Sequence, residues 1–230
     1  MSTVRVTYSA DRAEVLDRLR LQHARADRSI VDAMQALLRR DLVLARQVCE
    51  ADHDAKTVRY AIEEAVTSII ALQQPVAGDL RELMSIVAIA LNLERIAGHA
   101  EGIARNAIFL EDNPVAATEP DLWRMADVVR EMLQSATRSF LDRDQDLARL
   151  TVERDDEVDD IYGDIHERLI ARIADAEGDA DESDAITHVL WCSHNLERIG
   201  DRALNICERT IFQVTGRFER VHGPDYDPDS

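Results

Sequence analysis

The sequence predicts an all-α fold, built as two tandem three-helix bundles related by pseudo-symmetry. An eighteen-residue phrase occurs twice, as NLERIAGHAEGIARNAIF from Asn92 and as NLERIGDRALNICERTIF from Asn195. A second pair of segments, LLRRDLVLARQVCEAD from Leu37 and FLDRDQDLARLTVERD from Phe140, keeps the same offset of 103 residues. Two separated segments with one offset indicate the duplication of a whole unit. Glycine and proline are scarce, at 8 and 5, and the 4% aromatic and 46% apolar residues are typical of helices around aliphatic cores.

Each predicted unit contains three long amphipathic helices joined by short turns, as in an antiparallel bundle. In the first unit they cover about residues 12–40, 41–72 and 79–110. Asp41 and Asp144, which are 103 residues apart, each precede a helical run and are predicted N-caps. We expect a first repeat over residues 1–110, a linker over 111–121 and a second repeat over 122–215. The remaining residues, 216–230, contain Pro, Gly and acids without periodicity and are expected to form a disordered tail.

The stretch QQPVAGDLRE separates the second and third helices of the first unit. Pro75 and Gly78 end one helix, because proline removes a backbone donor and glycine favours the turn. Asp79 is the predicted N-cap of the next helix, and Glu82, three residues later, completes a predicted capping box. The matching turn in the second unit is DAEGDADESD.

The charge balance excludes several classes of partner. A formal net charge of −18 repels phosphate backbones and anionic lipid, so neither nucleic-acid binding nor electrostatic membrane docking is expected. No apolar run approaches the roughly 20 residues of a membrane span, and the N-terminus lacks the apolar stretch of a signal peptide. The three cysteines lack metal-type spacing and are expected to be reduced packing residues. The acidic excess favours basic partners or bound cations.

Two pairs of acidic residues lie beside the predicted core stripes of the second unit. Glu197 and Asp201 are four residues apart in the last helix, and Asp155 and Asp159 are four apart in the helix before it. Residues four apart share a helix face, so antiparallel packing would bring four carboxylates together. A proton, a basic side chain or a hard cation such as Mg²⁺, Mn²⁺, Ca²⁺ or iron would relieve their repulsion. The alternative is a solvated face with ordinary ion pairing from Arg198, since the chain has 45 acidic residues.

These motifs together resemble the PhoU family of bacterial phosphate-uptake regulators. The similarity rests on NLERIGD in a third helix, D-x-x-x-D in the helix before it, the QQPVAGDLR turn and the tandem repeat, and it covers about residues 10–213. It implies two similar three-helix bundles in a cytoplasmic protein that is often a homodimer. It also implies a negative regulator that acts between the ATPase subunit of the phosphate-specific ABC transporter and a sensor histidine kinase. Such a protein is at most peripheral to the membrane, through its partners.

The resemblance also implies metal binding, since some PhoU-like proteins hold multinuclear metal clusters through paired E(D)-x-x-x-D motifs. Carried over to this sequence, the complete pair is Asp155/Asp159 with Glu197/Asp201. The expected ion is Fe, Mn, Mg, Zn or Ca, with the second repeat preferred.

The first repeat departs from the metal pattern at two of its four positions. Asp52 is followed four residues on by Lys56 instead of an acid, and Glu94 is followed by Gly98 instead of aspartate. We expect the Lys56 ammonium to pair with Asp52 and Glu94 in place of a metal charge. The alternative is a rebuilt metal site, whose ligands would be Glu50, Asp52, His53 and Asp54.

Two further functions stay open on the sequence. One is a metal-free structural interaction protein, which uses the helical surfaces and not the acidic cluster. The other is a helical-bundle metalloenzyme, which is disfavoured because helical di-metal enzymes usually carry Glu-x-x-His on two helices and the second repeat has none. No P-loop or Rossmann glycine pattern is present either. We therefore expect a signalling adaptor and not an enzyme.

Overall fold

The structure, a computed structural model, describes residues 3–175 and 179–219, and of residues 3–6, 52 and 53 it describes the backbone alone. All elements within these ranges are helices, which confirms the predicted all-α class. In chain order they are α1 (Thr3–Arg39), α2 (Leu42–Gln73), α3 (Gly78–Phe109), the 3₁₀ helix η1 (Val115–Thr118), α4 (Asp121–Asp142), α5 (Gln145–Val152), α6 (Asp155–Asp175) and α7 (Ala180–Thr215).

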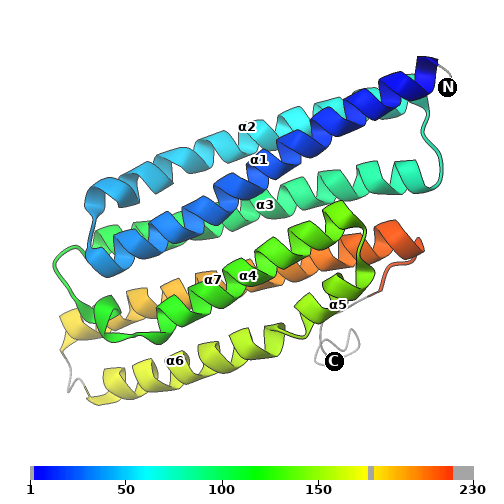
Figure 1. Cartoon of the computed structure of the whole chain (residues 1–230). Coiled ribbons are helices and arrows are strands. Elements are labelled where there is room, and N and C mark those ends of the chain that lie inside the picture. The colour runs from blue at the N-terminus through cyan, green and yellow to red at the C-terminus, as the bar shows by residue number, and fades with distance from the viewer. Residues whose placement is uncertain (1–2, 176–178, 220–230) are drawn as a thin grey trace, which may run out of the picture.

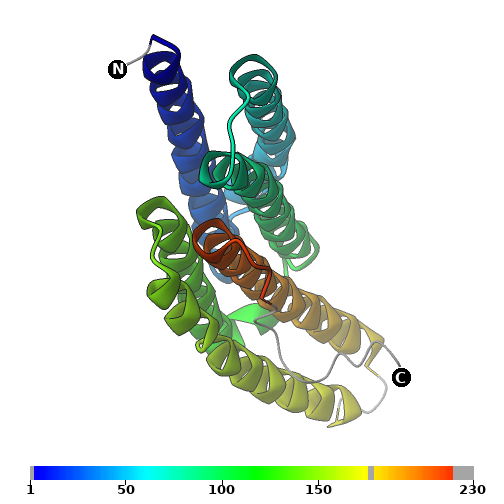
Figure 2. The ribbon, with the colours of Figure 1, turned by 90° about the vertical axis from the view of Figure 1, so that its right-hand side faces the viewer.

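The helices form two side-by-side bundles that share a central seam. Helices α1–α3 form the first bundle, and α4, α5 with α6, and α7 form the second (Figure 1). The third helices of the two repeats, α3 and α7, run antiparallel and make the most extensive helix–helix contact in the chain. Viewed from the end, α3 and α7 lie at the centre, with α2 and α6 on the outside (Figure 2). The two repeats are therefore joined mainly through the helices that carry the repeated phrase.

The duplication is visible in the backbone as well as in the sequence. Asp41 caps α2 by accepting hydrogen bonds from the N–H groups two and three residues on, and Asp144 caps α5 in the same way. The residue before each cap, Arg40 or Arg143, is left-handed with φ 56°. Few side chains other than glycine adopt this conformation. Its recurrence at equivalent positions shows that the two repeats make one and the same turn.

The middle helix of the second repeat is broken, which the sequence pattern did not predict. The first repeat has one continuous helix, α2, whereas the second has α5 and α6 separated at Glu153 and Arg154. The Arg154 N–H bonds to the carbonyl oxygen of Thr151, at 3.2 Å, which tightens the end of α5. Helix α6 begins at Asp155 with three acids in its first turn. The backbone N–H groups at a helix start have no acceptor within the helix, so negative charge is favourable there.

The predicted capping box at the start of α3 is wrong. Ala77, with φ 48°, occupies the N-cap position and makes no side-chain cap bond, while Asp79 lies within the first turn. Glu82 does not reach back to the cap, because it is buried, with 2% of its side chain exposed, and paired with Arg12 of α1. The tertiary contact with α1 thus replaced a local helix-end interaction.

Glu82 links the two repeats. Arg12 donates two hydrogen bonds to its carboxylate, from Nε at 2.5 Å and from Nη2 at 2.6 Å. Two groups from the second repeat also reach it: Arg143 Nη2 lies 3.2 Å from Oε2, and Gln213 Nε2 donates to Oε1 at 3.2 Å. One buried carboxylate therefore ties α1 and α3 to the ends of α4 and α7.

The linker and the start of the tail are packed against the bundles. Within the linker, η1 contacts α1 and α7, and Arg168 of α6 donates to Glu119 and Asp121, each at 2.6 Å. Phe218 stacks on Phe212 with ring centroids 4.0 Å apart. The start of the expected tail, residues 216–219, therefore contacts α7, and the remainder, 220–230, lies outside the described residues.

The core is aliphatic, and the cysteines belong to it. Cys192 and Cys207 are buried free thiols and Cys49 is half-buried. Burial raises the pKa of both buried thiols, that of Cys207 to about 12. Among the described residues one helix, α3, is long and apolar enough to cross a membrane by length and composition, contrary to the sequence expectation, but 56% of that window is buried inside the bundle. This is the position of a core helix.

Candidate metal centre and its counterpart in the first repeat

The four carboxylates of the second-repeat motif lie on the adjacent helices α6 and α7, near enough for the charges of the other three to act on Glu197. Asp155 and Asp159 come from the start of α6, and Glu197 and Asp201 come from the middle of α7. The pKa of Glu197 is raised to about 7 by burial and by the charges of Asp201, Asp159 and Asp155, while Arg198 opposes them. The cluster is therefore a site of concentrated negative charge, and Glu197 lies at its centre.

The surroundings of Glu197 do not neutralise it. Its Oε2 atom lies 3.4 Å from Nδ1 of His194, yet it is buried and accepts no hydrogen bond within the described part of the chain. Burial, and then the charge of Glu197, raise the pKa of the neighbouring Tyr162. Arg198 pairs with Asp201 at 2.7 Å instead. A buried acceptor without a donor is costly, which makes Glu197 the group most in need of a proton or a cation.

The donor set suits a hard cation, although the side chains are not drawn together around one. Carboxylate oxygens from two adjacent helices are the ligands that Mg²⁺, Ca²⁺, Mn²⁺ and iron prefer. As the side chains lie, however, no group of three or more His, Cys, Asp or Glu residues in the described ranges has the spacing to hold a metal. The chemistry and the unpaired Glu197 oxygen fit a bound ion, and the ligands would have to converge on it by rotamer changes.

In the first repeat, Arg59 is the cation at the equivalent acid, and not Lys56. Arg59 donates from Nε to Oε2 of Glu94 and from Nη1 to Glu63 at 2.5 Å. The Arg59 and Glu94 side chains are largely buried, whereas Lys56 is exposed. The predicted pairing of Lys56 with Glu94 is wrong, because Arg59 lies almost one helical turn further along α2 and on the side that faces α3. The side chain of Asp52 falls outside the described residues.

The residue at the position equivalent to Arg59 explains why the two repeats differ electrostatically. The residue 103 positions after Arg59 is Tyr162, and the residue 103 positions after Glu94 is Glu197. The first repeat therefore holds its glutamate with a fixed guanidinium, and the second leaves its glutamate beside a phenol and other acids. Sequence reasoning missed Arg59, although comparison at the repeat offset would have found it. The alternative site at Glu50 and His53 involves a His53 side chain that the structure does not describe.

Comparison with known proteins agrees with this duplicated arrangement. The family model described as PhoU domain matches residues 19–107 and 122–210, two segments whose limits are both shifted by 103 positions. The chain belongs to the PhoU family. Together the two matches cover both repeats, so membership applies to the whole bundle pair.

Individual PhoU relatives support the assignment over almost the full length. A phosphate-specific transport system accessory protein PhoU homolog of Clostridium acetobutylicum is 32% identical over 93% of this chain and 96% of its own. The homolog of Caulobacter vibrioides is 35% identical over 83% of this chain and 82% of its own. The crystal structure of PhoU from Pseudomonas aeruginosa superposes with a TM-score of 0.84 at 31% identity, covering 91% of this chain and 100% of that one.

A second solved structure is named as a regulator. The phosphate transport system regulatory protein PhoU from Streptococcus pneumoniae superposes with a TM-score of 0.84 at 25% identity, over 93% of this chain and 99% of that one. The PhoU relatives are named as accessory or regulatory proteins and not as enzymes. The expectation that the chain is not an enzyme is confirmed by this family membership.

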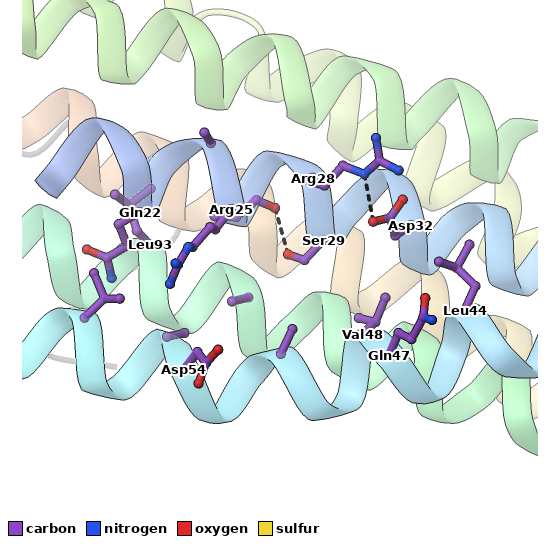
Figure 3. Close-up of a pocket in the computed structure, with 16 residues that line it drawn as sticks. Gln22, Arg25, Arg28, Ser29, Asp32, Leu44, Gln47, Val48, Asp54 and Leu93 are labelled. Atoms are coloured by element: carbon purple, nitrogen blue, oxygen red, sulfur yellow. Dashed lines mark hydrogen bonds and ion pairs between the residues drawn. The ribbon is translucent and has the colours of Figure 1, made fainter. Parts of the chain in front are cut away.

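Within this PhoU fold the first repeat has a pocket that the second repeat fills. A pocket of about 580 Å³ lies between α1, α2 and α3, with Gln22, Arg25 and Leu93 toward one end and Asp32 and Leu44 toward the other (Figure 3). The positions 103 residues later carry larger apolar side chains, which are all buried: Met125, Val129, Met132 and Val158 stand where the first repeat has Gln22, Ala26, Ser29 and Ala55.

The lining of the pocket is mostly apolar, but it includes two buried polar atoms without partners. The Gln22 side chain donates to the backbone oxygen of Ala90 at 2.9 Å, but its Oε1 and the Oδ1 of Asp32 are buried acceptors without a hydrogen-bond partner among the described residues. Such atoms are ordinarily paired with protein or with ordered water. The two repeats have therefore diverged in opposite ways. The second has a filled core beside an acidic cluster, and the first has an open pocket near a glutamate that Arg59 neutralises.

Proposed function

We propose that this chain is a cytoplasmic negative regulator of phosphate uptake and phosphate-starvation signalling. It acts between the ATPase subunit of the phosphate-specific ABC transporter and the sensor histidine kinase of the phosphate regulon. The observation that carries the proposal is the match of both repeats to relatives named as accessory or regulatory proteins of phosphate transport. Function as a homodimer is part of the same proposal.

The geometry supports a role in protein contact. The two bundles are tied together by the buried Glu82 contacts and by the α3–α7 seam, so the long outer helices α2 and α6 are presented on one stable frame. A protein that binds two partners in turn needs surfaces at constant relative positions.

Deleting the gene in its own host tests the regulatory role. In a strain that keeps its phosphate transporter and kinase, we expect phosphate-starvation genes to stay expressed in phosphate-rich medium, because the restraint on the kinase is lost. A transcriptional reporter for such a gene measures this, and reintroducing the intact chain should restore repression. Unchanged repression in the deletion strain would reject the proposed function while leaving the family and the fold unaffected.

We propose further that the second repeat binds a divalent or trivalent metal ion through Asp155, Asp159, Glu197 and Asp201. The unpaired Oε2 of Glu197 and its raised pKa support the proposal. A bound ion would supply the positive charge that this cluster lacks. Fe, Mn, Mg, Zn and Ca all remain candidates by ligand hardness.

Paired variants test the metal proposal. Asp155→Ala with Glu197→Ala should remove most of the bound metal, measured by elemental analysis after incubation with each candidate ion. Asp52→Ala with Glu94→Ala, the matched change in the first repeat, should leave metal content nearly unchanged, because Arg59 already neutralises Glu94. Equal loss from both double variants would reject the preference for the second repeat.

A metal-free structural interaction protein is the second candidate, and one observation favours it. The side chains of the described residues do not form a group spaced to hold a metal. On this alternative the purified chain contains no stoichiometric metal, and the Asp155/Glu197 double variant retains full repression in the reporter strain. Loss of repression together with loss of metal would favour the metal-binding regulator.

A further inference from the structure

Three arginines and one histidine, whose pKa is lowered by burial, lie near one another along the central seam, and they come from both repeats. Arg95 and His99 lie on α3, and Arg198 and Arg202 lie on α7. Each pair is four residues apart and so shares one helix face. Arg198 is the repeat equivalent of Arg95, and Arg202 is the equivalent of His99, each 103 positions later. We call this set of four residues the basic seam.

Direct contacts place the two halves of the basic seam together. Nδ1 of His99 lies 3.1 Å from Oδ1 of Asn195, which precedes Arg198 by one turn of α7. A Cβ atom added to Gly102 would lie 2.9 Å from the same Asn195 oxygen, so α3 and α7 approach closely there. The charges of Arg202 and Arg198 act on His99, and that of Arg95 acts on Arg202, so the residues of α3 lie near those of α7.

Two arginines of the basic seam have no ion-pair partner among the described residues. The charges of Arg198 and Arg95 act on Arg202 across the seam, as do those of Asp201 and Glu197. Nε of Arg202 is buried and has no hydrogen-bond acceptor in the described part of the chain. Of the ion pairs among described residues, none involves Arg95 or Arg202, while Arg198 is held by Asp201 at 2.7 Å. In a chain of net charge −18, such uncompensated arginines are unexpected.

We propose that the basic seam binds a small tetrahedral oxyanion. Guanidinium groups present several N–H donors in a plane, which match the oxygens of phosphate or sulfate. Arg202 Nε is a buried donor in need of an acceptor, and Arg95 is an exposed, unpaired cation on the opposite helix. An anion between Arg202 and Arg95 would accept a hydrogen bond from Nε of Arg202. It would also offset the repulsion between the two guanidinium groups. Because both repeats contribute, such an anion would also bridge the two bundles.

The basic seam adjoins the acidic cluster of the second repeat. Arg198 pairs with Asp201 at 2.7 Å, and the charges of Asp201 and Glu197 act on Arg202. The nearest acids limit how much negative charge the basic seam accepts, which favours one small anion. The inference rests on these contacts and charges and does not depend on the regulatory role.

Calorimetric titration of the purified full chain with inorganic phosphate, and separately with sulfate, tests the proposal at constant ionic strength. We expect saturable binding of one anion per chain. Arg95→Ala with Arg202→Ala should weaken it by about tenfold or more, since both unpaired guanidinium donors are lost. Arg202→Gln alone, which keeps a side chain of similar length, should weaken it by a smaller factor. Removal of two like charges should leave the thermal unfolding temperature unchanged or higher.

The matched control removes two arginines elsewhere. Arg20 and Arg138 are exposed and form only helix-surface pairs, with Asp17 and Asp142. The double variant Arg20→Ala with Arg138→Ala should bind phosphate within about twofold of the unchanged chain, because such surface charges act weakly. The proposal is overturned by an absence of saturable binding up to about 10 mM anion, by equal weakening in both double variants, or by binding of a poly-glutamate peptide without binding of phosphate or sulfate.

Discussion

Replacing Glu82 by alanine is expected to lower the free energy of unfolding by about 3 kcal/mol, because removing one partner of a buried ion pair leaves the others uncompensated. Arg12 would lose two short hydrogen bonds, and Arg143 and Gln213 would lose their contact with the same carboxylate. Urea unfolding followed by circular dichroism measures the change. The loss concerns the contact between the two repeats, so the transition should also become less cooperative.

The pKa of Glu82 determines how the stability lost in the Glu82→Ala variant depends on pH. Burial alone would raise the pKa of Glu82, but the hydrogen bonds and charge of Arg12, with Arg143, lower it below the ordinary value of 4.5. A lowered pKa in the folded state contributes stability that is present above about pH 4.5 and is lost as the pH falls through the folded-state value. The difference between the Glu82→Ala variant and the unchanged chain should therefore shrink on acidification.

An exposed ion pair provides the control. Glu14 pairs with Arg18 four residues along α1, and more than half of the Glu14 side chain is exposed. Glu14→Ala should cost only about 0.2–1 kcal/mol. If Glu82→Ala costs no more than Glu14→Ala, the carboxylate does not join the repeats as described.

Replacing Glu197 by glutamine is expected to stabilise the metal-free chain by roughly 1–3 kcal/mol at about pH 8. Its pKa is raised from 4.5 to about 7, by burial and by Asp201, Asp159 and Asp155. A raised pKa in the folded state means that ionised Glu197 opposes folding above the ordinary value. The gain from glutamine should therefore be absent below about pH 4.5, grow between 4.5 and 7, and then level off. Urea unfolding in the presence of a chelator, at several pH values, measures it.

The equivalent residue of the first repeat should respond in the opposite direction. Glu94 is bonded to Arg59, so Glu94→Gln weakens a charge-assisted hydrogen bond and should destabilise the chain by about 1–2 kcal/mol at neutral pH. The same substitution of glutamate by glutamine, at two positions 103 residues apart, would then change the free energy of unfolding in opposite directions. A stabilising effect at both positions would show that Arg59 does not neutralise Glu94.

Much of the fold followed from patterns that act within one helix. The repeat offset, the N-caps at Asp41 and Asp144 and the face shared by Glu197 and Asp201 depend on residue type and on the rotation of 100° per residue. These rules need no knowledge of the neighbouring helices. The second-repeat acids could be grouped for the same reason, since both pairs flank an apolar stripe.

Two failures of prediction occurred where one helix meets another. Lys56 and Arg59 are both cations on α2, and spacing alone favoured Lys56 beside Asp52. Glu82 has the spacing of a capping box, and only the approach of α1 gave it Arg12 instead. The contact of a side chain with another helix depends on how each helix is rotated about its own axis. Turning a helix about its axis by the 100° between successive residues brings different side chains to the neighbouring helix, although the local sequence pattern stays the same.

The sequence by itself determined the duplication and the helical class, because periodicity and end signals are local and additive. Only the tertiary structure decided which charges meet. It put Arg59 on Glu94, left Glu197 among acids, and gathered Arg95, Arg198 and Arg202 at the seam of α3 and α7. These contacts join residues far apart in the chain, and their energies depend on burial and distance, which are set when the bundles pack against each other.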